Sequence, residues 1–302
     1  GLYIMTTQIG WISGPGLGGL LYNFCRDSLK LQVPDVFRVP YFIAALVILP
    51  MPLLTILFLK ESVKRRTTFP PIINKASLCK SNRIIPASLD APSWNAKTTK
   101  MTRTLYVMNF MNGISMGLAM PLFQLFVMSK ITSDIATIGF MITGAGSIGL
   151  LTNLPAGWLS DRYGRKSLAL WSGILSRGCM AGLPLTRTVP QASFIYFGRS
   201  AAYAVSQPVM SAIQGDIVPP KTRGKVFGTI QAFFNGGATL GPIMGGWIFS
   251  KTSLISWKIR QITLEGIVTP FWIGAILGLV GLALFAKNII ETRPPNKSET
   301  FR

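Results

Sequence analysis

Long apolar runs recur along this chain, and they constrain its fold more than any other feature. Each holds about 19 to 25 residues, enough for a helix to cross a hydrocarbon layer of roughly 30 Å. Gly and Pro occur inside the runs, as membrane helices tolerate. The sequence therefore predicts an all-α membrane protein with eight membrane-spanning helices. The runs cover residues 1–23, 40–59, 104–129, 135–158, 168–186, 191–212, 226–249 and 266–287.

The distribution of positive charge predicts the orientation of these spans. The chain has 30 Lys and Arg against 10 Asp and Glu, a net charge of +20. If the spans alternate in direction, most basic residues fall on one side, in 60–103, 159–167, 213–225 and 288–302. Because basic flanking segments face the cytoplasm, we expect this side to be cytoplasmic. The charge thus indicates topology rather than nucleic-acid binding.

Several kinds of chemistry have no signal in the sequence. It contains no histidine, and its three cysteines are predicted in different compartments, which indicates neither a metal site nor a disulfide framework. No GxxxxGK[ST] phosphate-binding loop occurs, so any pumping has to use an ion gradient. We expect no enzyme activity and no cofactor.

A ten-residue pattern occurs twice in the chain. Residues 10–19 read GWISGPGLGG and residues 237–246 read GATLGPIMGG, so both follow Gly-x-x-x-Gly-Pro-x-x-Gly-Gly. Glycines four residues apart give a helix a flat face for close contact, and the proline bends it. The residues that define the pattern are Gly10, Gly14, Pro15, Gly18, Gly19, Gly237, Gly241, Pro242, Gly245 and Gly246.

The repeat predicts a chain made of corresponding halves, as in transporters whose substrate site lies between repeats. About four spans, on the order of 130 residues, are then expected upstream of Gly1. The predicted domains are 1–60, the last two helices of an N-terminal bundle; 61–103, a cytoplasmic and solvated central linker; 104–287, a C-terminal six-helix bundle; and 288–302, a cytoplasmic tail.

A charged stretch, GWLSDRYGRK at residues 157–166, lies between the fourth and fifth runs. It resembles the loop signature Gly-x-Leu-Ala-Asp-Arg-x-Gly-Arg-Lys/Arg of the major facilitator superfamily and departs from it only at Ser160. The repeated pattern is similar to the antiporter motif of that family's drug:proton antiporter branch. PPKTRGK at 219–225 looks like the family's loop before helix eleven. The resemblance implies a twelve-helix bundle of which helices five to twelve are present.

The resemblance also implies a latch that closes the cytoplasmic face and re-forms during transport. Gly164 would supply a tight turn, Gly157 close helix packing, and Asp161 a helix cap. Arg165 could pair with Asp216, at the end of the sixth run. The alternative is a basic hairpin that only fixes topology. The predicted latch residues are Gly157, Asp161, Arg162, Gly164, Arg165, Lys166, Asp216 and Arg223.

Polar residues within the spans are the candidates for a substrate cavity, because charges there are costly and usually functional. Arg199, Tyr203 and Gln207 recur every four residues and share a helix face. We expect Arg199 in the cavity or gate, with a structural role as the alternative, and the reverse preference for Arg177. Two further stripes line the cavity or bond between helices: Asn109 with Asn112, and Gln231 with Asn235.

These features predict a secondary active transporter of the plasma membrane that exports small organic or drug-like solutes by proton antiport. Its partners would be a small-molecule substrate, H+ and the lipid bilayer, with no nucleic acid. No acidic residue lies in the middle of a span, so a protonatable group is expected upstream of Gly1. Two alternatives stay open: an importer of an anionic solute with Arg199 as charge partner, and a truncated remnant that does not transport.

Overall fold

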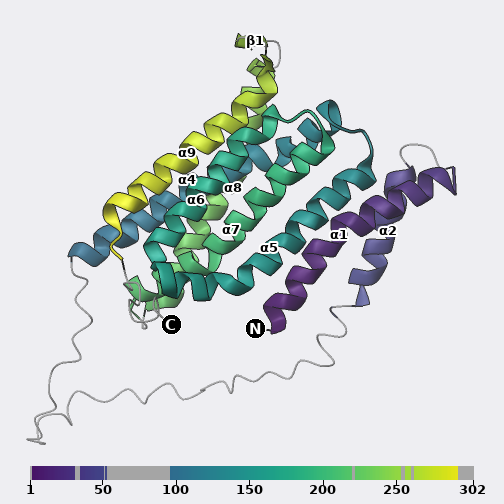
Figure 1. Cartoon of the computed structure of the whole chain (residues 1–302). Coiled ribbons are helices and arrows are strands. Elements are labelled where there is room, and N and C mark those ends of the chain that lie inside the picture. The colour runs from purple at the N-terminus through teal and green to yellow at the C-terminus, as the bar shows by residue number, and fades with distance from the viewer. Residues whose placement is uncertain are drawn as a thin grey trace, which may run out of the picture. The chain divides into compact units, whose positions relative to one another are not determined.

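The structure is a computed structural model, and it describes residues 2–30, 35–50, 52, 96–219, 222–252, 256–259 and 262–291 (Figure 1). The chain divides into two compact units. One comprises Gly1–Phe24 and Trp94–Arg302, and the other Cys25–Ser93. The predicted latch residues and the predicted cavity residues all belong to the first unit.

The described residues are predominantly helical, which confirms the all-α class. Four of the helical segments among them are long and apolar enough to cross a membrane: Thr98–Lys130, Ile135–Tyr163, Arg165–Leu185 and Gly266–Asn288. Short 3-10 turns, Leu183–Leu185 and Gly266–Val268, extend two of them. The helices are α1 (Leu2–Asp27), α2 (Asp35–Ile48), α4 (Ala96–Lys130), α5 (Ile135–Tyr163), α6 (Arg165–Gly182), α7 (Val189–Ile217), α8 (Arg223–Thr252) and α9 (Thr269–Asn288).

The helices correspond to the predicted apolar runs, with differences at their ends. Helix α4 begins at Ala96, so the last part of the predicted linker 61–103 is helical. The rest of that linker, much of the run 40–59, and the tail after 291 lie outside the described residues. Helices α7 and α9 begin beside Pro190 and Pro270, where the missing N–H has no helical partner to lose.

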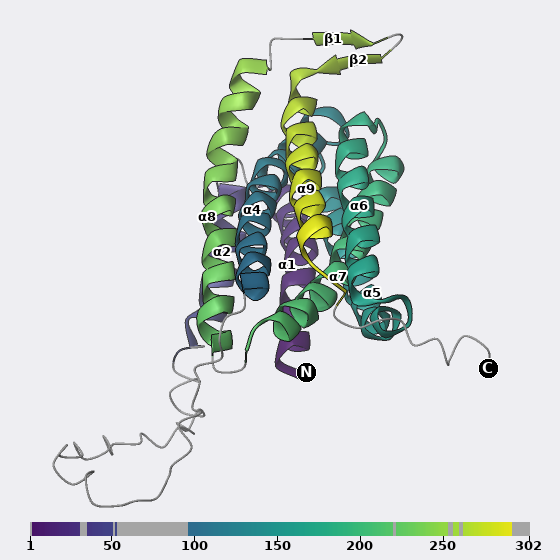
Figure 2. The same cartoon turned by 90° about the vertical axis from the view of Figure 1, so that its left-hand side faces the viewer.

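Glycines bring α4 and α8 into close contact. A Cβ at Gly241 would lie 2.6 Å from the Cα of Gly117, and one at Gly237 would meet the backbone of α4 at Phe110. Helix α4 also contacts α9 on another side, so it lies between α8 and α9 (Figure 2). Gly237, Gly241 and Gly245 of the second copy thus pack closely on α4, because a larger residue would push the two backbones apart. Gly246 does not, since an added Cβ there would meet no described atom within 4 Å.

The other contacts join α7 to α5 and α6, and α9 to α6. Two apolar cores fill the spaces between these helices. One contains Phe123 stacked on Tyr196, with ring centroids 4.2 Å apart, together with Phe271. The other is built around Leu105, Ile213 and their neighbours. These cores hold α4, α6, α7 and α8 around the candidate cavity.

Helix α1 packs on α5 through part of the first copy of the pattern. A Cβ at Gly19 would lie 2.8 Å from the Cα of Ala136, whereas one at Gly10, Gly14 or Gly18 would meet no described atom within 4 Å. The hydroxyl of Thr143 accepts a hydrogen bond from the Gly16 amide at 2.9 Å and donates one to the Ile12 carbonyl at 2.8 Å. An unbroken helix pairs that amide and carbonyl with each other. Pro15 adjoins the site, so a side chain from α5 bridges the helical ladder of α1 beside its proline.

A short hairpin connects α8 to α9, between the last two predicted apolar runs. Strands β1 (Ser256–Ile259) and β2 (Ile262–Glu265) are antiparallel, with Ser256 opposite Glu265. Apolar and polar residues alternate in SWKI and in ITLE. That period of two is the signal that indicates strands.

Candidate functional site

The charged stretch 157–166 spans the end of α5, a turn and the start of α6. Gly164 has φ 87°, and its amide donates to the Ser160 carbonyl at 3.1 Å. A residue with a side chain is strained at this positive φ, so glycine is required for the turn. The tight turn predicted at Gly164 is present. The close packing predicted at Gly157 is absent among the described residues. That glycine is exposed, and an added Cβ would meet no described atom within 4 Å.

An ion pair joins the start of α6 to the end of α7. Arg165 Nη1 lies 2.5 Å from Asp216 Oδ2, with 16% and 38% of the two side chains exposed. Arg165 Nε is buried without a hydrogen-bond partner among the described residues. The structure thus brings together the two residues that the sequence analysis expected to pair.

Arg223 attaches the start of α8 to the same end of α7. Its Nη2 donates to the Gly215 carbonyl at 2.9 Å, and its Nε donates to the Val218 carbonyl at 3.3 Å. Carbonyls in the last turn of a helix lack helical partners and carry partial negative charge, so a guanidinium stabilises them. Arg165, Asp216 and Arg223 therefore fix α6 and α8 to the end of α7.

The carboxylate that caps the start of α6 comes from Glu291, which follows α9. The Lys166 amide donates to Glu291, at 3.0 Å to Oε2 and 3.2 Å to Oε1. Asp161, the residue predicted to cap a helix, lies exposed in the last turn of α5. Next to it, the Arg162 guanidinium lies 5.4 Å from the Trp158 ring. Glu291 could not be found from local spacing because it follows α9.

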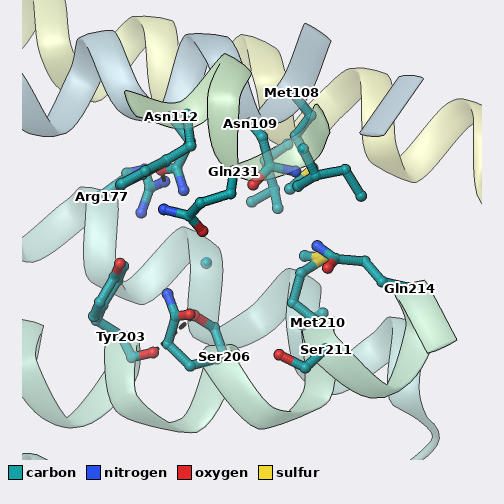
Figure 3. Close-up of a pocket in the computed structure, with 16 residues that line it drawn as sticks. Met108, Asn109, Asn112, Arg177, Tyr203, Ser206, Met210, Ser211, Gln214 and Gln231 are labelled. Atoms are coloured by element: carbon teal, nitrogen blue, oxygen red, sulfur yellow. Dashed lines mark hydrogen bonds between the residues drawn. The ribbon is translucent and has the colours of Figure 1, made fainter. Parts of the chain in front are cut away.

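A cavity of about 320 Å³ opens among α4, α6, α7 and α8 (Figure 3). The α7 side chains face those of α4 and α8 across it. Asn109, Asn112, Tyr203, Gln207 and Gln231 line it, as the sequence analysis predicts. The lining residues that it missed are Met108, Ala169, Gly173, Arg177, Ser206, Met210, Ser211, Gln214, Ile230, Phe234 and Leu282.

The two arginines within the bundle exchange their expected places. Arg199 is buried with its guanidinium 5.9 Å from the Tyr196 ring, and it is not among the cavity-lining residues. Arg177, expected to be structural, lines the cavity instead. Residues 199, 203 and 207 extend over about two turns of α7. The cavity reaches Tyr203 and Gln207 but ends before Arg199.

The prediction that Asn235 lines the cavity is also wrong, because Asn235 is not among the residues that line it. It is exposed on α8, and its Oδ1 accepts a hydrogen bond from Gln231 Nε2 at 3.1 Å. A second hollow, between α5 and α7, shares Tyr203, Gln207 and Ser211 with the first. The α7 stripe is thus the common wall of both spaces.

A hydrogen bond and close packing hold Arg177 in the cavity wall. Its Nη2 donates to Asn112 Oδ1, and its Nε is buried without a described hydrogen-bond partner. A Cβ at Gly278 of α9 would meet Arg177 Nε, so this glycine makes room for the guanidinium. Arg177 is the charged residue in the cavity lining, whose other polar members are amides and hydroxyls. Such a wall suits a polar, hydrogen-bonding solute.

Comparison with known proteins gives consistent matches. A model described as Major Facilitator Superfamily matches residues 105–302. Multidrug resistance protein MdtG of Enterobacter lignolyticus is 26% identical over 243 residues, which cover 80% of this chain and 53% of the relative. The uncharacterized MFS-type transporter YqjV of Bacillus subtilis is 23% identical over 186 residues, 60% of this chain and 41% of that protein.

A likeness of fold extends to a solved structure. The crystal structure of peptide transporter POT in complex with sulfate superposes with a TM-score of 0.52 at 19% identity, covering 66% of this chain and 42% of that one. This chain spans about half the length of the curated relatives it matches. The helices, the turn at residue 164 and the family match agree: this multi-pass membrane chain belongs to the Major Facilitator Superfamily.

Proposed function

We propose that the protein is a secondary active transporter that exports small organic or drug-like solutes by proton antiport. The observation that carries the proposal is the polar cavity enclosed by apolar membrane helices, because polar groups are costly there unless they serve a ligand or a partner. The similarity to multidrug resistance protein MdtG supports export of organic solutes.

In this proposal the contacts at the ends of α6 and α7 form the cytoplasmic latch. The Arg165–Asp216 pair and the Arg223 bonds connect three helices whose ends would separate when the cavity opens to the cytoplasm. Both partners of the pair are partly exposed, so breaking it costs little. A weak, reversible contact suits an element that opens and closes in each cycle.

The α1–α5 contact is the second structural element of the transport mechanism that we propose. Thr143 supports the backbone of α1 beside Pro15, which would keep that helix bent against α5. In the domain arrangement expected from the repeat, residues 1–60 belong to the N-terminal bundle and 104–287 to the C-terminal bundle. The contact would then seal the interface between bundles against leakage.

Proton coupling requires a group that changes protonation within the membrane. The cavity-lining residues include no Asp, Glu or His. We therefore propose that the coupling group belongs to a segment outside this lining, in line with the expected upstream helices. The basic segments 61–103 and 288–302 would face the cytoplasm from the plasma membrane.

The test is transport by the protein expressed from its complete reading frame and reconstituted into liposomes. We expect an imposed pH gradient to drive accumulation of an organic solute, and expect Gln207→Ala to reduce it because this residue lines the cavity. A matched control is Gln191→Ala, which removes the same amide near the outer end of α7. Equal transport by the two variants would contradict the assignment of the cavity.

An importer of an anionic solute is the second candidate, and one observation favours it: the charged residue in the lining is a cation, Arg177. The charge partner that the sequence analysis named, Arg199, lies outside the lining. The direction of uptake under a reversed pH gradient distinguishes this candidate from export.

A further inference from the structure

One charged side chain belongs to the lining of the cavity. Arg177 is cationic, and the 16 lining residues include no carboxylate. The described acidic residues elsewhere in this unit lie at the ends of helices or strands or in connections, at Asp134, Asp161, Asp216, Glu265 and Glu291. The guanidinium therefore has no acidic partner in the wall that it shares.

The bonds of Arg177 hold the guanidinium without neutralising it. Its bond to Asn112 uses a neutral amide oxygen as acceptor. A guanidinium has five N–H donors, and Nε is buried with no described acceptor. A buried charge that lacks a counter-charge is strongly unfavourable. The site is consequently poised to gain from a bound anion.

Packing fixes the position at which this charge is presented. Gly278 lies against Arg177, so α9 backs the side chain. Across the cavity lie Tyr203 and Ser206 of α7 (Figure 3), and Gln207 of the same helix also lines it. The Gln207 amide can donate and accept hydrogen bonds. The two hydroxyls, which donate to Met116 Sδ and to the Tyr203 carbonyl, keep lone pairs that can accept, so an uncharged hydroxylated part of a ligand finds partners here.

We propose that this cavity binds a small hydroxylated carboxylate, with Arg177 as its charge partner and Asn112 as the residue that positions Arg177. The planar carboxylate matches the paired donors of a guanidinium. The volume of about 320 Å³ is at the small end of ligand pockets, which favours a compact solute. This inference rests on the proposed transport function and narrows its substrate class from drug-like solutes in general to organic anions.

Binding to the purified protein, expressed from its complete reading frame, tests the inference separately from transport. The probes are gluconate, glucose as an uncharged molecule of similar size, and tetraphenylphosphonium as a lipophilic cation. We expect calorimetry to detect gluconate and to give at least tenfold weaker binding of glucose, because a charge-assisted hydrogen bond contributes about 1.5–3 kcal/mol.

Two variants and a control localise the effect. Arg177→Gln removes the charge, and Asn112→Asp keeps the charge but gives it an internal carboxylate partner. Both should weaken gluconate binding at least about tenfold. Asn112→Asp should also stay folded, because it adds an ion pair to the wall. Arg187→Gln removes an exposed arginine outside the cavity and should leave binding unchanged.

The outcomes separate this inference from the proposed function. Binding of gluconate that survives Asn112→Asp, or preferential binding of tetraphenylphosphonium, overturns the anion site. In the second case solute export remains supported. Binding of gluconate with the expected variant pattern but no transport of any probe would sustain the anion site and contradict the transporter proposal.

Discussion

Arg165, at the first position of α6, and Asp216, in the last turn of α7, form an ion pair with 2.5 Å between Nη1 and Oδ2. They lie far apart in the sequence and meet because α6 and α7 pack side by side. The glycine turn at residue 164 places Arg165 at this junction.

Loss of this pair should change transport far more than stability. For Arg165→Gln we expect a loss of less than about 1 kcal/mol in unfolding free energy, because partly exposed pairs contribute little. We expect transport to fall at least tenfold if the pair is the latch. Rescue by the double exchange Arg165→Asp with Asp216→Arg checks the assignment, and transport unchanged in the single variant would contradict it.

The Thr143 hydroxyl should contribute measurably to stability. Thr143→Val leaves the Gly16 amide and Ile12 carbonyl without their bridge, and a buried unpaired polar group costs about 1–3 kcal/mol. Thermal unfolding in detergent should show the loss. Thr152→Val is the matched control, because its hydroxyl bonds only carbonyls of its own helix. Equal losses in both variants would argue against the bridge.

Two glycines of one motif should respond oppositely to alanine. Gly241→Ala places a methyl group against Gly117 and should destabilise the α4–α8 contact by about 1–3 kcal/mol. Gly246→Ala meets no described atom within 4 Å, so the better helix propensity of alanine should stabilise α8 by up to about 1 kcal/mol. Chemical unfolding measures both. Destabilisation by Gly246→Ala as large as that by Gly241→Ala would contradict this packing.

Asp134, the residue that caps α5, should make stability depend on acid pH. Hydrogen bonds from Thr137 and then Asn23 lower its pKa to about 2. Because the folded pKa is below the ordinary value, the stabilisation is present above about pH 4 and is lost as the pH falls toward 2. Asp134→Asn should flatten this dependence, measured as unfolding temperature against pH. Asp35→Asn is the control: the Asp35 carboxylate accepts a hydrogen bond from Arg38 in the same helix.

The sequence was sufficient where the signal was local or repeated. Apolar runs predicted the helices, and the loop signature predicted the turn at Gly164 and the partners Arg165 and Asp216. Contacts between distant segments were out of reach: Thr143 bridging α1 and Glu291 capping α6 have no signal in local spacing.

The predictions for Arg199 and Asn235 as cavity-lining residues failed for the same physical reason. A four-residue period identifies a helix face but not the depth at which that face meets a cavity or a neighbouring helix. The α7 stripe itself was detectable, since Tyr203, Ser206, Met210 and Gln214 follow helical spacing. Arg177 was underestimated because its role depends on Asn112 and Gly278, which lie on two other helices.

The proposed mechanism requires that the cavity opens to each side of the membrane in turn, and its most direct test is the solvent exposure of Ser206 from each side. With Cys25, Cys79 and Cys179 replaced by serine, Ser206→Cys in the reconstituted protein is treated with an impermeant maleimide from one side at a time. We predict labelling from both sides when Asp216 is unchanged. When Asp216→Asn breaks the ion pair with Arg165, labelling from the cytoplasmic side should be at least threefold faster. Labelling confined to one side, and unaffected by Asp216→Asn, would contradict the transport mechanism proposed for this protein.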